Sequence, residues 1–165
     1  MKEKIFFVDI CNSLADVNSQ LRNMGYRTDI YPVQIPAKVW ADMSIFRNAH
    51  PIQSVCDFVK SLAGYKLIYL TARPIEARES TLLWLEKHGL PKAPLIHTNG
   101  RSKGEFVKAF SFDKNVAVVG AIEDSPHEIR NYTEVVPEMD LYIPQWEYNK
   151  HIDGKRLEVG EQQAA

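Results

Sequence analysis

The chain has 165 residues, which is enough for one domain with a buried core and too few for two domains of ordinary size. Hydrophobic residues make up 45% and charged residues 25%, the usual balance of a soluble globular protein, and the apolar runs are much shorter than a membrane span. With 20 Lys and Arg against 21 Asp and Glu, the net charge of -1 gives no overall field that would attract a nucleic-acid backbone, so any anionic ligand must be held by local groups.

Short apolar runs, each bounded by turn or polar residues, recur along the chain. They are IFFVD at 5–9, KLIYLT at 66–71, PLIHT at 94–98 and VAVVGAIED at 116–124. Helical patterns separate them, at residues 52–62, 75–88 and 102–110. Because continuous apolar runs suit strands covered on both faces, the alternation predicts an α/β fold, an open parallel sheet with helices on both faces and right-handed crossovers.

Local signals mark the ends of two predicted helices. Gly89 and Pro91 end the helix at 75–88, since Gly suits the left-handed residue after a helix and Pro cannot continue it. Ser125 and Pro126 predict the start of another helix, because Ser caps a helix and Pro fits its first turn. A fifth strand is expected near residues 139–143.

Two segments do not fit the alternation of strands and helices. Residues 17–50 begin with a helical pattern at 17–24 and become rich in Pro and aromatic residues, which we interpret as a small cap inserted over the edge of the sheet. The cap's aromatic residues either stack a nucleobase or simply pack against the core; they are Tyr26, Tyr31, Trp40 and Phe46. The tail at 154–165 has little to bury and is expected to fray or extend outward from a single domain.

The cysteines give information about the cellular compartment. Cys11 and Cys56 are too far apart for a CxxC motif, and the N-terminus lacks the regions of a secretory signal. We therefore expect a cytoplasmic protein with free thiols. Cys56 falls in a helical pattern, where a small buried hydrophobe is the simplest interpretation.

Polar residues follow the predicted strands, where an open parallel sheet binds its ligands. These residues are Asp9, Thr71, Thr98-Asn99 and Glu123-Asp124. Each one alone has an ordinary structural explanation, as a turn residue, a strand end or an acidic first turn of a helix. Their occurrence together at successive strand ends favours a site for phosphate and for Mg²⁺, which prefers carboxylate and carbonyl oxygens.

The order of Asp9, Thr71, Lys103 and Glu123-Asp124 resembles the haloacid dehalogenase (HAD) superfamily of phosphatases. Within that superfamily, the segments DICNSLAD, LIYLTARP, IEDSP and QWEYNKH are similar to the 5'(3')-deoxyribonucleotidase branch. The resemblance extends over residues 5–151. It implies a Rossmann-like HAD fold and a Mg²⁺-dependent phosphohydrolase that acts on nucleoside monophosphates or a related phosphomonoester.

The resemblance also implies roles for particular residues in catalysis. Asp9 would attack the phosphorus to form an aspartyl phosphate. Thr71 and Lys103 would hold and neutralise the phosphoryl oxygens, and Ala72 and Arg73 would contact the substrate, in a reaction where positioning and electrostatics supply most of the rate. Asn99 and Arg101 are second-rank candidates for phosphate contact.

The implied metal site has three ligands. Mg²⁺ would bind between the Asp9 carboxylate, the backbone carbonyl of Cys11 and Asp124, and Glu123 would orient this shell. The expected partner is a small phosphorylated substrate, most simply a nucleotide. A nucleic-acid end stays open as a substrate, although the near-neutral charge disfavours it. No membrane partner is expected, and a homo-oligomer is left open.

Cys11 is the serious departure from the family pattern, because it stands where these phosphatases carry a second Asp that protonates the leaving oxygen and then deprotonates water. A thiol has a reference pKa of about 8.5, against about 3.9 for Asp, so it is a poor base at neutral pH. General acid–base catalysis contributes roughly 10²- to 10⁴-fold, so its loss predicts a slow enzyme rather than none. The changes at Asn12 and Ser13 are milder, because Asn tolerates left-handed backbone and Ser keeps a hydroxyl.

Three interpretations follow from this departure. The chain is an active or impaired phosphohydrolase, or a degenerate HAD-like protein that binds a phosphorylated ligand or partner without turnover. The third alternative is the same scaffold with another chemistry, in which Cys11 takes part or a redox state gates it.

Overall fold

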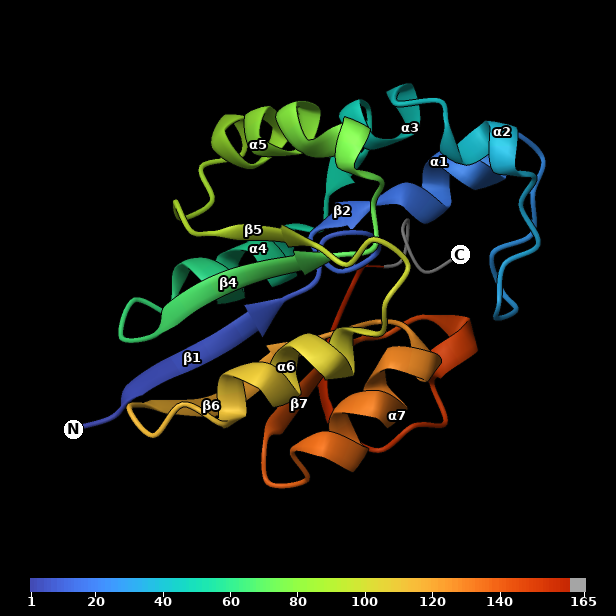
Figure 1. The fold of residues 1–165 in the computed structure, drawn as a ribbon. Coiled ribbons are helices and arrows are strands. Elements are labelled where there is room, and N and C mark those ends of the chain that lie inside the picture. The colour runs from blue at the N-terminus through green and yellow to red at the C-terminus, as the bar shows by residue number, and fades with distance from the viewer. Residues whose placement is uncertain (161–165) are drawn as a thin grey trace.

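A parallel sheet runs through the centre of the computed structural model, which describes residues 1–160 (Figure 1). Its strands are β1 (Glu3–Val8), β4 (Lys66–Thr71), β5 (Leu95–His97), β6 (Val116–Ile122), β7 (Asp140–Pro144) and β8 (Lys155–Leu157). They lie in the order β5-β4-β1-β6-β7-β8, and every neighbouring pair is parallel. The predicted α/β Rossmann-like fold is confirmed, and so is the strand expected near residues 139–143.

Helices lie on both sides of this sheet (Figure 1). They are α1 (Val17–Asn23), α2 (Ala37–Trp40), α3 (Ser44–Arg47), α4 (Gln53–Lys60), α5 (Arg78–Lys87), α6 (Lys103–Ser111) and α7 (Pro126–Val135). The helix predicted at 75–88 begins with a 3-10 turn, η1 (Ile75–Ala77), before it continues as α5. As predicted, α7 starts with Ser125 as its cap and Pro126 in its first turn.

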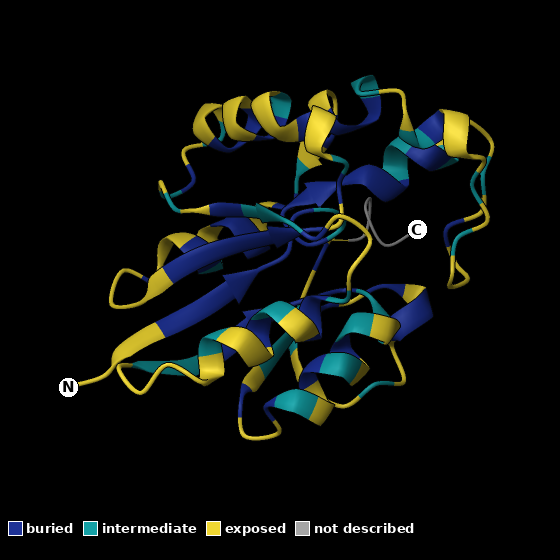
Figure 2. Cartoon of the chain, viewed as in Figure 1, coloured by how far each residue is buried: buried dark blue, intermediate teal, exposed yellow. Residues whose placement is uncertain are grey.

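The two faces of the sheet are buried against different helices, because successive side chains of a strand point in opposite directions. On β1, Phe6 and Val8 belong to a cluster that includes residues of α4 and α5, whereas Ile5 and Phe7 belong to a cluster with α6 and α7. In Figure 2 the buried residues, coloured dark blue, lie in the central strands, and the outer faces of the helices are exposed.

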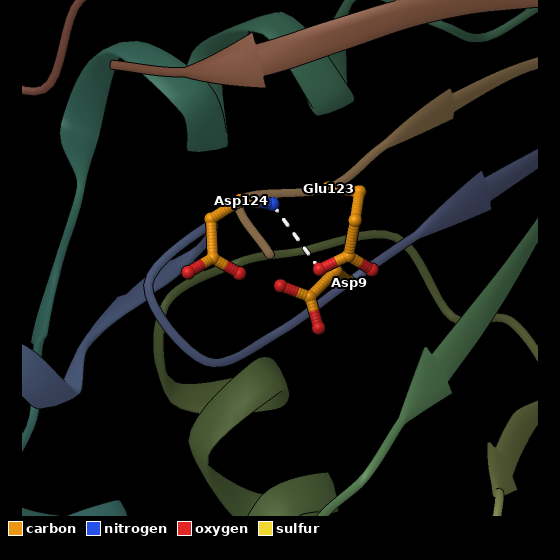
Figure 3. Close-up of side chains that lie close together, drawn as sticks. All are labelled: Asp9, Glu123 and Asp124. Carbon is orange, nitrogen blue, oxygen red and sulfur yellow. Dashed lines mark hydrogen bonds between the residues drawn. The ribbon is translucent and has the colours of Figure 1, made fainter. Parts of the chain in front are cut away.

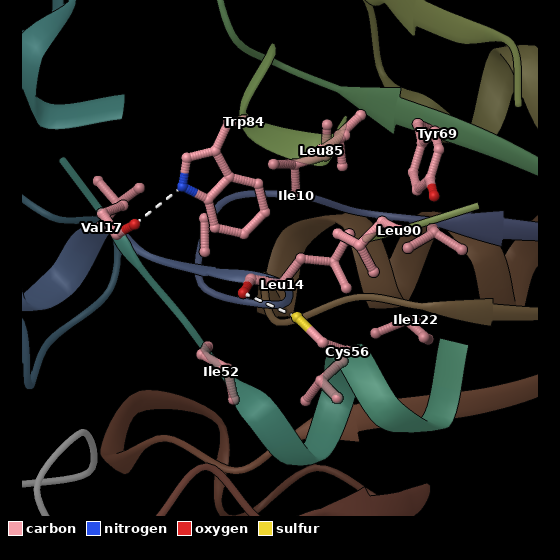
Figure 4. Packing of buried hydrophobic residues seen from close by; sticks show 14 of the residues in the cluster. Ile10, Leu14, Val17, Ile52, Cys56, Tyr69, Trp84, Leu85, Leu90 and Ile122 are labelled. Carbon is pink, nitrogen blue, oxygen red and sulfur yellow. Dashed lines mark hydrogen bonds between the residues drawn. The ribbon is translucent and has the colours of Figure 1, made fainter. Parts of the chain in front are cut away.

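The cluster on the side of α4 and α5 contains Cys56 and the buried Trp84. Figure 4 shows part of it, with Trp84 of α5 above Ile10 and Leu14. Cys56 is 1% exposed and its thiol contacts the carbonyl of Leu14, so the expectation of a small buried hydrophobe is confirmed. Both cysteines are free thiols.

The pairing of β1 with β6 contains an irregularity. Ile5 pairs with Val118, but Phe6 pairs with Gly120, so the register shifts by one residue and Val119 has no partner on β1. A bulge of this kind places two residues of one strand opposite one residue of its neighbour.

The segment predicted as a cap is joined to the rest of the fold by a short antiparallel ribbon. Its strands are β2 (Ala15–Asp16) and β3 (His50–Pro51), in which Asp16 lies opposite His50. Asp16 also starts α1, because its side chain accepts a hydrogen bond from the backbone N–H of Ser19 at 2.9 Å. The chain that connects β2 to β3 forms α1, α2 and α3. These helices lie on the same side of the sheet as α5 and beyond the carboxyl edge of the sheet (Figure 1).

The end of the chain differs from its prediction. Lys155–Leu157 form β8 at the edge of the sheet. From the sequence, residues 154–165 are instead predicted to form a tail with little to bury. The reason for the difference is that Leu157 and Val159, two residues apart, pack against the first core cluster, and Val159 is 4% exposed. The remaining part of the predicted tail, residues 161–165, lies outside the described residues. Within residues 1–160, no helix is long and apolar enough to cross a membrane.

Gly120 lies where β6 passes closest to the Phe6 ring. A methyl group at this position would come within 2.3 Å of the ring, and Phe6 is itself packed against Phe58 and Tyr142. We therefore expect Gly120→Ala to lower the free energy of unfolding by about 1–3 kcal/mol through overpacking, measured by chemical denaturation. Gly64→Ala is the matched control, since nothing lies within 4 Å of its added methyl group; equal stabilities for the two variants would contradict the prediction.

Candidate active site

Acidic side chains converge at the carboxyl ends of β1 and β6, which are neighbours in the sheet. Asp9 follows β1, and Glu123 and Asp124 follow β6. One carboxylate oxygen from each lies within 4.8 Å of the other two, and all three residues are buried. In Figure 3 the carboxylate of Asp124 faces that of Asp9. Three carboxylates in this arrangement can hold a metal ion.

Lys103, at the start of α6, is the cation that holds two of these carboxylates. Its Nζ donates to Asp9 Oδ1 at 2.5 Å and to Glu123 Oε2 at 2.6 Å, and the residue is 2% exposed. Burial by itself lowers the pKa of the Lys103 ammonium, but the charges of Asp9 and Glu123 outweigh burial and raise that pKa well above its usual value. The side chain therefore stays charged at all physiological pH values.

The negative charge of the cluster exceeds what Lys103 neutralises. Burial raises the pKa of Glu123 and of Asp124, and the charge of Asp9 raises both further. Oxygen donors with excess negative charge suit a hard divalent cation, because the cation would relieve the repulsion among them. The donor set of this cluster therefore fits a cation such as Mg²⁺.

Hydrogen bonds distinguish the three carboxylates. Both oxygens of Glu123 are occupied, because Oε1 accepts the backbone N–H groups of Asp124 and Ser125 at 3.2 Å and 3.1 Å while Oε2 accepts from Lys103. Asp9 Oδ2 accepts from the Ser13 hydroxyl at 2.7 Å. Glu123 therefore orients Lys103 and the backbone of Asp124 and Ser125 through hydrogen bonds at both of its carboxylate oxygens.

The loop after β1 is shaped by Asn12, whose φ of 60° lies in the left-handed region. Its N–H donates to the carbonyl of Ala15 at 2.7 Å, and its side chain accepts the N–H of Asn18 at 2.7 Å, which ties the loop to α1. The milder departures noted in the sequence are therefore accommodated, since Asn12 takes the backbone conformation that Gly often supplies and Ser13 keeps its hydroxyl beside Asp9.

Cys11 lies in the same loop and contacts an arginine from the loop after β4. Arg73 Nε donates to the sulfur of Cys11 at 3.1 Å. Burial raises the pKa of the Cys11 thiol, the Arg73 guanidinium opposes the rise, and the Asp9 carboxylate adds to it. The thiol is therefore protonated at neutral pH.

Arg73 itself is almost completely buried, at 3% exposed. Its Nη1 donates to the Thr81 hydroxyl at 3.0 Å, and its guanidinium lies 4.5 Å from the centre of the Phe46 ring. Its Nη2 has no hydrogen-bond partner within residues 1–160. The contact with Cys11 was not expected from the sequence, because 62 positions separate the two residues.

The structure brings together some of the other predicted site residues. Thr71 ends β4, and its hydroxyl accepts the N–H of Arg73 at 3.2 Å, while Ala72 lines the cavity described below. Asn99 lines a neighbouring hollow instead. Arg101 points elsewhere, because its Nε donates to Glu105 at 2.8 Å on the surface of α6.

Residues after β7 support the site, in the 3-10 turn η2 (Glu147–Asn149) and the residue before it. The Tyr148 hydroxyl donates to Asp124 Oδ2 and accepts from Asn18 Nδ2 at 3.3 Å. Asn149 Nδ2 donates to the Asp124 carbonyl at 2.9 Å, and the Trp146 indole N–H donates to the Asn12 carbonyl at 2.7 Å. The sequence pointed to this segment only through the QWEYNKH resemblance and did not assign these contacts.

A cavity of about 440 Å³ opens above the acidic cluster. Asp9, Lys103 and Asp124 form part of its floor. Residues of the segment 17–50 form its other wall, namely Tyr31, Pro32, Val33, Trp40 and Phe46. The Tyr31 hydroxyl is hydrogen-bonded to the Ser125 hydroxyl at 2.7 Å, so the loop between α1 and α2 reaches across the cavity to the start of α7.

Tyr148 should affect metal affinity through Asp124. Because its hydroxyl accepts from Asn18, its proton is directed at Asp124, which orients that carboxylate. Tyr148→Phe keeps the ring and should weaken Mg²⁺ binding about tenfold, measured by isothermal titration calorimetry. The control is Tyr31→Phe, which removes a hydroxyl bonded to Ser125 rather than to a carboxylate. Equal affinities in the two variants would show that Tyr148 does not position Asp124.

Comparison with known proteins supports the fold. No family model matches the sequence, and no curated protein matches it. Solved structures of similar fold include one of the Pnkp1/Rnl/Hen1 RNA repair complex, with a TM-score of 0.59, and one of the Pnkp1/Rnl/Hen1 complex, with a TM-score of 0.52. Each is 16% identical over 86% of this chain. This chain spans less than half of those chains, 42% and 46%, and at this identity the likeness shows the fold alone.

Proposed function

We propose that the chain is a Mg²⁺-dependent phosphohydrolase of the HAD type, which acts on a nucleotide or a related phosphorylated molecule through an aspartyl phosphate. The observation that carries the proposal is the buried bridge from Lys103 Nζ to Asp9 and Glu123, with Asp124 beside it, at the carboxyl edge of the sheet. An acidic nucleophile, a fixed cation and a metal-binding carboxylate are the groups that phosphoryl transfer requires.

The first chemical step assigns a role to each of these side chains. Asp9, held by Lys103 and Ser13, attacks the phosphorus and forms the aspartyl phosphate. The Lys103 ammonium and the Thr71 hydroxyl, both on buried residues, stabilise the charge on the phosphoryl oxygens. Water then hydrolyses the aspartyl phosphate and restores Asp9.

The metal ion has a defined place in this proposal. Asp9, Asp124 and the backbone carbonyl of Cys11 would hold Mg²⁺, while Glu123 orients the cluster. When bound, Mg²⁺ neutralises the phosphoryl charge that Lys103 leaves uncompensated.

The cavity supports a substrate with a flat apolar part. Tyr31 and Tyr148 lie with ring centres 6.0 Å apart, and Trp40 lines the same cavity. Rings of this kind stack nucleobases, which supports a nucleotide. Because the solved structures of similar fold include an RNA repair complex, a phosphorylated nucleic-acid end is a second candidate, against which the net charge of -1 counts.

A phosphatase assay tests the proposal directly. Purified protein with Mg²⁺ should release inorganic phosphate from 4-nitrophenyl phosphate and from a panel of nucleotides, and EDTA should stop the release. Asp9→Asn protein purified in parallel controls for contaminating phosphatases.

The alternative function is binding of a phosphorylated ligand or partner without turnover, which the thiol at position 11 favours. No release from any substrate, together with measurable binding of Mg²⁺ and a nucleotide by calorimetry, would support this alternative and refute the enzyme.

A further inference from the structure

Arg73 is a buried cation whose side-chain contacts include no anion. The residue is 3% exposed, and its guanidinium donates to the Cys11 sulfur at 3.1 Å and to the Thr81 hydroxyl at 3.0 Å. It also lies 4.5 Å from the centre of the Phe46 ring, and its Nη2 has no hydrogen-bond partner within the described chain. A buried charge is costly unless an anion and hydrogen bonds compensate it, so this guanidinium is suited to bind an anionic group of a ligand.

Contacts from separate elements hold Arg73 in place. Its backbone N–H donates to the Thr71 hydroxyl at 3.2 Å, and its carbonyl oxygen accepts a hydrogen bond from Nδ1 of His97, at the end of β5, at 2.8 Å. Its side chain contacts α5 through Thr81 and α3 through Phe46. A cation that is already fixed loses little conformational entropy when a ligand binds, so Arg73 can serve as a preformed anion site.

Arg73 stands in a wall that two cavities share. The hollow lined by Asn99 has a volume of about 540 Å³ and adjoins the cavity over the acidic cluster. Four residues line both, namely Trp40, Ala72, Arg73 and Pro74. Asp9, Lys103 and Asp124 line the cavity but not the hollow. A group bound at Arg73 can therefore lie outside the place where the transferred phosphoryl group must meet Asp9.

The side chains of the neighbouring hollow leave Arg73 available to an anion. Asn99 offers an amide that can donate a hydrogen bond, and Ala37 and Ala41 occupy little space. The acidic residue that lines the hollow is Glu76, which is exposed, so water and salt screen its charge more than that of the buried Arg73. The hollow therefore favours an anionic group beside Arg73.

We propose that Arg73 binds a second phosphate group of the substrate, one that stays on the product. This inference rests on the proposed phosphohydrolase function and names its substrate class, nucleotides with two phosphates on the sugar, such as adenosine 3',5'-bisphosphate. In the proposed function, Lys103, Thr71 and Mg²⁺ already compensate the phosphoryl group that is transferred, which leaves Arg73 for another. The internal phosphodiester of a nucleic-acid end has the same chemistry, but the net charge of -1 favours the small bisphosphate.

The overall reaction consumes one water molecule. The bond between phosphorus and the sugar oxygen breaks, its electron pair stays on that oxygen, and the oxygen takes up a proton. Water then attacks the phosphorus of the aspartyl phosphate, and the electron pair of the broken bond returns to the Asp9 carboxylate. The water gives up one proton, which balances the first. The products are inorganic phosphate and a nucleoside monophosphate whose remaining phosphate lies beside Arg73.

Matched adenosine nucleotides test the second phosphate. Adenosine 3',5'-bisphosphate differs from AMP only by its 3'-phosphate and from 3'-AMP only by its 5'-phosphate. With Mg²⁺, we expect kcat/KM for the bisphosphate to exceed that for either monophosphate by at least roughly tenfold, since a charge-assisted hydrogen bond contributes about this much. The gain should lie in KM rather than in kcat, because the second phosphate is bound equally in the ground state and the transition state.

Two substitutions at Arg73 separate its charge from its place in the fold. Arg73→Gln should raise KM for the bisphosphate roughly tenfold with little change for AMP, and Arg73→Lys, which keeps the charge, should retain more of the bisphosphate preference. Each rate is divided by that of the same preparation with 4-nitrophenyl phosphate, which has no second phosphate, so that a loss of folded protein cancels. Arg47→Gln is the control and should keep the full preference, because Arg47 is exposed and follows Phe46 on α3.

The outcomes separate this inference from the function on which it rests. The second-phosphate inference is overturned, and a phosphohydrolase remains, if 4-nitrophenyl phosphate is hydrolysed but kcat/KM is the same for the bisphosphate and the monophosphates. Equal slowing of AMP and the bisphosphate by Arg73→Gln would overturn it as well. The dinucleotide pApA carries a phosphodiester in place of the 3'-phosphate, and a higher kcat/KM for pApA than for the bisphosphate would replace the bisphosphate by a nucleic-acid end.

Absence of phosphate release from every substrate would instead refute the proposed function. Calorimetry with Mg²⁺ then decides the inference about Arg73 by itself. Tighter binding of the bisphosphate than of AMP, lost in Arg73→Gln, would support a second-phosphate site, and equal binding would overturn it.

Discussion

Asp9→Asn protein should release phosphate at least about 10³-fold more slowly than wild type and should not melt at a lower temperature in the absence of metal. The amide cannot form the aspartyl phosphate, so the rate falls with every substrate. The melting temperature should not fall, because the substitution removes one of three buried carboxylates whose nearest oxygens lie within 4.8 Å of one another, and so reduces the repulsion among them. Lys103 keeps its bond to Glu123 at 2.6 Å.

Phosphate release and thermal melting with and without Mg²⁺ measure the two parts of this expectation. The stabilisation by Mg²⁺ should shrink in the variant, because one of the acidic ligands is gone. Asp57→Asn on the exposed face of α4 is the control and should match wild type in both measurements. Wild-type rates in Asp9→Asn protein would exclude Asp9 as the nucleophile.

Lys103→Met should lower the free energy of unfolding of the metal-free protein by about 3–5 kcal/mol at neutral pH. The methionine fills a similar volume, but Asp9 and Glu123 are left buried without their common cation. Burial already raises the pKa of Glu123, and the loss of Lys103 raises it further. A carboxyl group with a raised pKa in the folded state contributes stability at low pH that is lost as the pH rises, so the defect should be larger at pH 8 than at roughly pH 5.

Chemical denaturation at both pH values tests this expectation, and Lys108→Met provides the matched control. Lys108 lies on the same helix but is exposed, so its substitution should change the free energy of unfolding by less than about 0.5 kcal/mol at either pH. Equal losses in the two variants would show that the bridge to Asp9 and Glu123 does not stabilise the fold.

The sequence predicted the residues that follow the strands because their positions depend on local patterns. Asp9 and Glu123-Asp124 each come directly after a buried apolar run, and parallel strands bring such residues to one edge of the sheet. Lys103 was predicted only by resemblance, and the structure places it on both Asp9 and Glu123.

The contacts that were missed join segments far apart in the chain. Tyr148 and Asn18, separated by 130 positions, meet only because the loop after β7 folds back against α1. The contact of Arg73 with Phe46 likewise depends on how α3 packs beyond the sheet. The edge strand β8 was missed because Leu157 is its single apolar residue, which is too little to predict a strand against a polar background.

The register shift between β1 and β6 decides which residue stands level with Asp9. Because Val119 is accommodated without a partner, Val8 pairs with Ile122, and the next residues along the two strands are Asp9 and Glu123. If the register did not shift and Val119 paired with Phe6, Ile122 would lie level with Asp9 and the acidic pair would lie one residue beyond it. The meeting of the carboxylates is therefore set inside the sheet, several residues before the loops that carry them.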